Sequence, residues 1–164
     1  MNKSQWYIGA PNGVILCVNR VDHGQLAGLM YHSYSAQAEP FSGIEEMTHR
    51  MERLYDALRF PFPGTSERSF GQTKTSVPTL TEGDKVMADE KLLSKHGDLG
   101  TFIVRVQHRQ NSSWQGRITW MEENKTLNFR SVWEMIKLIE SAVDTVSVQE
   151  EAPGAELTWS DQTE

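Results

Sequence analysis

The chain has 164 residues, a net charge of −6 and a pI of about 5.4. This length suffices for one compact domain or two very small ones, and the acidic balance argues against tight nucleic-acid binding, which needs a basic face. The single cysteine, Cys17, excludes a disulfide within the chain and a cysteine-based metal cluster. Because Cys17 lies inside an apolar run, we expect a buried and unreactive thiol.

Residues 1–60 are predicted to form one unit of three strands and a helix. Strands are expected at 5–10, 13–21 and 25–34, where apolar residues alternate or cluster between Pro-Asn-Gly and Asp-His-Gly turns. Ser42 and Glu45 form a capping-box pattern that predicts the start of a helix. Apolar residues at helical spacing continue to Leu58, and Pro61 is expected to end this helix.

A second unit is predicted after a flexible linker. Residues 61–83 are rich in Pro, Gly, Ser and Thr, which is typical of a long loop. Residues 84–148 then contain a short amphipathic helix at 84–96, strands at 100–109, 113–121 and 126–129, and a helix that follows a capping box at Ser131 and Glu134. Residues 149–164 are acidic, without lysine or arginine, and are predicted to be a disordered tail.

The two halves align without a gap when residue n is laid on residue n+88. Eight identical pairs fall within Gly13–Ala57, and most other core positions are apolar in both halves. The identical pairs are Ile15/Ile103, Val18/Val106, Gly28/Gly116, Phe41/Phe129, Glu46/Glu134, Met47/Met135, Glu52/Glu140 and Asp56/Asp144. The sequence therefore predicts an α+β fold of two tandem β-β-β-α units, with antiparallel sheets, helices on one face and a pseudo-twofold axis.

One group of residues has the chemistry of a ligand site. Because side chains alternate along a strand, Arg105, Gln107, Arg109 and Arg117 are expected on one sheet face, with Gln107 near Gln115 across the hairpin. Trp114, near the turn, adds an aromatic plane, whereas Trp120 and Trp133 are expected in the core. Such a face suits a nucleotide or single-stranded nucleic acid, and a solvated polar face is the alternative interpretation.

Two resemblances bear on this region. The strings from Arg105 to Arg109 and from Asn111 to Gly116 are similar to the RxxxR and [D/N]xSxxG motifs of PilZ domains, which bind cyclic di-GMP, but that family separates the two motifs by a strand or more. The run from Phe102 to Val143, with RQNSSWQG and FRS before a helix, resembles small Firmicutes proteins without an established activity. That resemblance implies a bacterial source and no mechanism.

The sequence contains no Walker loop, GxGxxG, HExxH or CxxC motif, and the histidines lack metal-ligand spacing. No catalytic residue, metal or cofactor is therefore predicted, and a hydrolase or transferase is not favoured. The N-terminus carries no apolar signal segment and no run of about 18 apolar residues is present, so we expect a cytoplasmic protein. The preferred function is a non-enzymatic binding or regulatory protein that acts through protein partners or as a homodimer. The alternative is the nucleotide or single-stranded nucleic-acid binder.

Overall fold

The computed structural model describes residues 8, 11–64, 68–71 and 79–151. Six strands form one antiparallel sheet in the order β3-β2-β1-β4-β5-β6. The elements are β1 (Val14–Asp22), β2 (Gln25–His32), β3 (Glu39–Ser42), α1 (Ile44–Leu58), η2 (Glu82–Asp84), α2 (Asp89–Leu92), β4 (Gly100–His108), β5 (Gln115–Trp120), β6 (Lys125–Phe129) and α3 (Val132–Glu151). The predicted α+β class and the antiparallel arrangement are confirmed.

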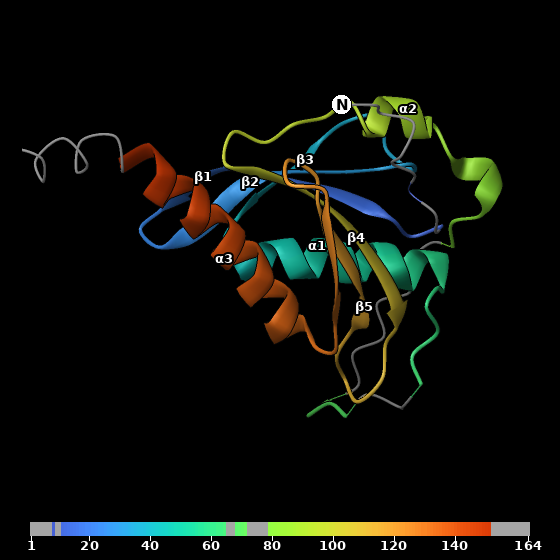
Figure 1. Ribbon diagram of the computed structural model, residues 1–164. Helices are drawn as coiled ribbons and strands as arrows, with labels where there is room; N and C mark the ends of the chain where they lie inside the picture. Colours follow the sequence, from blue (N-terminus) through green and yellow to red (C-terminus); the bar gives the residue numbers. More distant parts are fainter. Residues whose placement is uncertain (1–7, 9–10, 65–67, 72–78, 152–164) are drawn as a thin grey trace, which may run out of the picture.

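Helices α1 and α3 lie on one face of the sheet and the shorter α2 segment on the other (Figure 1), and a hydrophobic cluster lies on each face, the larger one on the side of α1 and α3. Alternation along β1 directs Val14, Leu16 and Val18 toward α1 and α3, which supply buried residues such as Met47, Met51, Met135 and Ile139. The intervening Ile15 and Cys17 face the opposite side, where Met87, Leu92 and Leu93 of the α2 segment cover them. Burial raises the pKa of the Cys17 thiol to about 12, so the predicted inert thiol fits its surroundings.

Each of the two central strands, β1 and β4, contains a bulge near its C-terminal end. The pairing of β1 with β2 shifts between Val18 and Arg20, and the pairing of β4 with β5 shifts between Val106 and His108. A bulge inserts one unpaired residue, here Asn19 or Gln107, and reverses the inward and outward alternation beyond it. This reversal decides where the residues after Gln107 point.

Glycines lie directly opposite the two bulges. A Cβ atom on Gly28 would overlap the carbonyl of Cys17, and a Cβ atom on Gly116 would overlap the carbonyl of Arg105. Neighbouring backbones therefore approach closely at both places, which only glycine allows.

Several expected elements differ from the structure. The strand expected at 5–10 lies outside the described residues except for Ile8, which is not in a strand, and β3 at Glu39–Ser42 was not predicted. The predicted capping box at Ser42 is wrong, because Ser42 is the last residue of β3. Gly43, with φ of 95°, is the N-cap of α1, and no side chain caps the helix there. At α3 the capping serine is confirmed, since the Glu134 N–H donates to Ser131 Oγ at 3.1 Å.

The helix predicted at 84–96 is wrong: it is replaced by the short η2 and α2 with an extended link between them. The backbone N–H groups of Val86 and Met87 both donate to the Ser33 carbonyl, which holds this link against the end of β2 and interrupts the helix. In the predicted linker, Gly64 donates to the Arg109 carbonyl and Leu80 donates to the Ala57 carbonyl, so both ends of residues 61–83 are tied to the fold. No helix within the described ranges is long and apolar enough to span a membrane.

Candidate functional site

Arg105 and Arg117 lie side by side, as predicted, because they are direct partners across β4 and β5. Arg105 is half-buried: its Nε donates to the Ile8 carbonyl at 2.6 Å, and Nη1 lies 3.5 Å from the Thr119 hydroxyl. Arg117 is exposed. The predicted pairing of Gln107 with Gln115 is wrong, since the bulge leaves Gln107 exposed and pairs His108 with Gln115.

Arg109 does not join these arginines, and the prediction of three converging arginines is wrong. The bulge at Gln107 moves Arg109 to the face that carries α1, where its side chain is 5% exposed. Its Nη1 lies 2.6 Å from Asp56 Oδ1 and 3.9 Å from Glu52 Oε1, and its Nε donates to the Pro61 carbonyl at 2.7 Å. A guanidinium with these partners joins α1 and the segment after it to the sheet.

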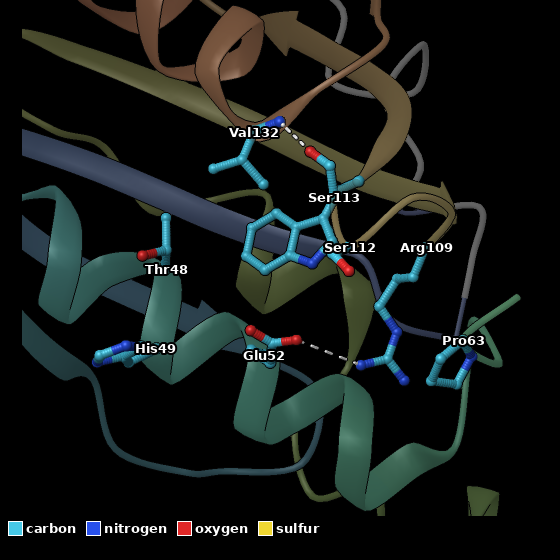
Figure 2. Close-up of a pocket in the computed structure, with 9 residues that line it drawn as sticks. Thr48, His49, Glu52, Pro63, Arg109, Ser112, Ser113 and Val132 are labelled. Carbon is cyan, nitrogen blue, oxygen red and sulfur yellow. Dashed lines mark hydrogen bonds and ion pairs between the residues drawn. The ribbon is translucent and has the colours of Figure 1, made fainter. Parts of the chain in front are cut away.

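Trp114 is also on the helix side. It is buried in a T-shaped contact with Tyr55, with ring centroids 5.4 Å apart at an interplanar angle of 81°. Trp114 and Arg109 therefore border the same hollow, a pocket of about 240 Å³ between α1, the β4–β5 loop and the start of α3 (Figure 2). The structure brings these two predicted site residues together and separates them from Arg105, Gln107 and Arg117.

Several residues that line the pocket in Figure 2 bond to one another. The Val132 N–H donates to Ser113 Oγ at 3.0 Å, and Arg109 is held by the acids of α1. The loop adopts a left-handed backbone at Asn111 and Ser112, with φ of 55° and 53°. These contacts fix the loop between α1 and α3. We therefore interpret this region as a structural joint between the two helices and the sheet.

A second hollow runs between β6 and α3 and is almost entirely apolar. We call it the apolar groove; its volume is about 190 Å³. Leu127 lies on its sheet side, opposite Ile118 in the strand register, and remains 55% exposed although it occupies a core-facing position. The groove is lined by Phe102, Ile118, Trp120, Lys125, Leu127, Leu138, Ser141, Ala142 and Thr145.

A third hollow lies at the opposite end of the sheet, between the β2–β3 region and α1. We call it the polar groove; its volume is about 450 Å³. It is lined by His32, Tyr34, Ser35, Glu39, Arg50, Arg53, Leu54, Ala57 and Leu80. His32 is buried, its Nδ1 accepts the Tyr34 N–H at 3.1 Å, and its Nε2 lies 3.6 Å from Glu39 Oε1. The His32 imidazole, followed by the Arg50 and Arg53 charges, holds the pKa of Glu39 below its usual value.

The two grooves occupy matching positions in the chain. Six lining residues of the polar groove lie 88 positions before six lining residues of the apolar groove. The pairs are His32/Trp120, Glu39/Leu127, Arg50/Leu138, Arg53/Ser141, Leu54/Ala142 and Ala57/Thr145. Neither groove was predicted, although the 88-residue offset already pairs their residues in the sequence.

Within the part of the chain that the structure describes, no three His, Cys, Asp or Glu side chains converge as metal ligands would. Comparison with protein-family models, with curated proteins and with solved structures found no match for this chain. The geometry of the described residues is therefore the basis for assigning a function.

Proposed function

We propose that this is a non-enzymatic binding protein that takes an extended segment of a partner protein along β6, with an apolar side chain of the partner in the apolar groove. The observation that carries the proposal is Leu127, a leucine on the core-facing side of an edge strand that α3 leaves 55% exposed. Burying such a side chain in a complex removes apolar surface from water, which is the main driving force of protein association.

The open edge of β6 supports this mode of binding. β6 is the last strand of the sheet, and within the described ranges no backbone hydrogen bond reaches its outer side. At the other end, β3 is only four residues long and contains the exposed Pro40, which prevents further pairing at that position. An added strand therefore finds backbone partners at β6, while alternate side chains supply specificity.

The lining of the apolar groove favours a particular partner chemistry. Lys125 is the one charged residue in its lining, and the hydroxyls of Ser141 and Thr145 lie at the α3 side. A segment with an aliphatic or aromatic residue in the groove and an acidic residue near Lys125 matches these groups. A second copy of this chain is the other candidate occupant, and the experiment below separates the two.

We infer further that the two halves are copies of one β-β-β-α unit, as the sequence predicts. Ile15 pairs with Ile103 in the β1–β4 ladder. On either side of this pair, Val14 pairs with Val104 and Leu16 pairs with Phe102. These register pairs are what a twofold axis between residues 15 and 103 requires of positions 88 apart. The matching bulges at Asn19 and Gln107 and the matching grooves add support.

Binding of a nucleotide or single-stranded nucleic acid stays as the alternative function. It now rests on the neighbouring Arg105 and Arg117 alone, because Arg109 and Trp114 lie on the helix side of the sheet. An arginine pair beside the Thr119 hydroxyl still suits a phosphate group.

Selection of random 12-residue peptides on the full chain tests the main proposal. We expect selected peptides to alternate apolar and polar residues, and Leu127→Glu to weaken their binding about tenfold or more, since a charge then enters the groove. Asn128→Glu is the matched control, because it places the same charge on β6 but on the opposite sheet face. Equal loss in both variants, or selected peptides that still bind Leu127→Glu, would contradict the proposal.

The molar mass in solution, measured by light scattering, separates the two occupants. A dimer that Leu127→Glu converts to a monomer would identify a second copy of this chain as the occupant. A salt-sensitive affinity for oligonucleotides that Arg117→Gln removes, together with no peptide binding, would instead favour the alternative function.

A further inference from the structure

We propose that the polar groove binds a small monocarboxylate carried on a short aliphatic body. This site lies at the other end of the sheet from β6 and is independent of the partner-binding proposal. The argument rests on which charged groups in the groove are already satisfied, on its net charge, and on what the fold needs at these positions.

Arg53 provides an available guanidinium in the polar groove. It is exposed, and no described residue forms a hydrogen bond or an ion pair with it. Its neighbour Arg50 is only partly satisfied: Nη2 lies 3.0 Å from Glu46 Oε1, while its buried Nε has no partner. A planar guanidinium fork binds a carboxylate through two parallel hydrogen bonds, so these two side chains form an anion-binding wall.

The acidic groups around the polar groove limit the negative charge that a bound ligand can carry. Glu39 lines the groove as a carboxylate next to His32, and Glu46, outside the groove lining, is the partner of Arg50, so two acids offset the charges of Arg50 and Arg53. Glu82, Asp84 and Lys85 near Tyr34 add one further negative charge in sum. A single carboxylate can pair with Arg53, whereas a dianion such as a phosphate monoester meets repulsion from these acids.

The other walls of the groove favour an aliphatic body. Leu54 and Ala57 of α1 and Leu80 of the following segment supply apolar surface, and the groove volume of about 450 Å³ exceeds the size of a short fatty acid. The ligand that matches all of these groups has one carboxylate at Arg53 and a chain of several methylene groups against these three residues.

The fold itself does not need charges at these positions. In the apolar groove the residues 88 positions later are Trp120, Leu127, Leu138 and Ser141, and the sheet and helix there pack without an arginine or a buried imidazole. The structural role of these positions is therefore met by uncharged residues. The charged set in the polar groove has a separate purpose, and binding an anion is the one its geometry supports.

Isothermal titration of the full chain with hexanoate, hexanol, hexylamine and hexyl phosphate tests the proposal. We expect hexanoate to bind and the other three to bind at least about tenfold more weakly. Arg53→Gln should weaken hexanoate binding about tenfold or more, with Arg53→Lys intermediate, because an ammonium group keeps the charge but loses the fork. Glu39→Gln should bring the affinity for hexyl phosphate closer to that for hexanoate, since one repelling charge is removed.

Arg130→Gln is the matched control. Like Arg53, Arg130 is an exposed arginine, but it pairs with Glu134 and lies outside the groove. We expect its hexanoate affinity to equal that of the unchanged chain. The proposal is overturned if hexanol binds as well as hexanoate, if Arg53→Gln leaves binding unchanged, if both arginine variants lose it equally, or if none of the four compounds binds.

Discussion

The two ends of the sheet have the same architecture and opposite chemistry. Beside α1, the groove contains a buried histidine, a glutamate and two arginines, whereas beside α3 the matching positions carry tryptophan, leucine, leucine and serine. The edge strand differs in the same way, since β3 is short and interrupted by Pro40 and β6 is open. The comparison teaches that a similar arrangement of strand and helix at the two ends of the sheet supports grooves of different chemistry.

The largest expected effect concerns the feature that both halves share. Gly28→Ala and Gly116→Ala should each destabilise the protein by about 3 kcal/mol, because each new methyl group collides with the carbonyl of the neighbouring strand. Urea unfolding gives the free energies. Gly71→Ala is the control, since no atom lies within 4 Å of its added Cβ, and it should change little. If only one of the two strand variants were destabilised, the halves would not be equivalent in their packing.

A smaller effect should separate the halves. Arg109→Ala removes bonds to Asp56, to the Pro61 carbonyl and to the Tyr55 carbonyl, and we expect it to destabilise the fold by about 2 kcal/mol, with the exposure of Asp56 limiting the loss. The residue 88 positions earlier is Val21, which is 46% exposed. Val21→Ala should stay within about 0.5 kcal/mol of the unchanged chain. Equal thermal midpoints for the two variants would show that Arg109 is not a structural joint.

The smallest expected effect is a pH dependence confined to the polar groove. The folded-state pKa of Glu39 is held below its usual value of 4.5, so its contribution to stability is present above that value and is lost as the pH falls through the lowered pKa. Glu39→Gln should therefore flatten the stability profile below pH 4.5, in unfolding titrations at several pH values. Leu127→Glu places a carboxylate at the matching position without an imidazole or guanidinium partner, and we expect it not to add a similar dependence. An unchanged profile in Glu39→Gln would show that His32 and the arginines do not stabilise the Glu39 carboxylate.

The strands of the second half, the α1 and α3 helices and the burial of Cys17 follow from local patterns in the sequence. Apolar alternation identifies β4 and β5, and helical spacing with Pro61 identifies the end of α1. The strand β3 was not predicted because Glu39–Ser42 has a proline and only one buried residue, yet Phe41 matches Phe129 in the 88-residue alignment. The 88-residue alignment therefore held information about Phe41 that the local pattern lacks.

The predicted site depended on an alternation that the β4 bulge interrupts. The bulge at Gln107 lies beside the close approach of the backbones at Gly116, and its extra residue places Arg109 on the face that carries α1. Two tryptophans also differ from the prediction, whereas Trp120 packs against the core as expected. Trp114 is in the core, whereas Trp133, expected there, is 62% exposed, with the Lys137 ammonium 5.4 Å from the centroid of its ring.

The most direct test of the account is a nuclear magnetic resonance titration that maps both ligands on one labelled sample. We expect a selected peptide to shift the amide resonances of β6 and α3, and hexanoate to shift those around Glu39, Arg50 and Arg53, with neither ligand displacing the other. Shifts from both ligands in the same groove, or competition between them, would contradict the claim that the matching grooves have acquired different ligands.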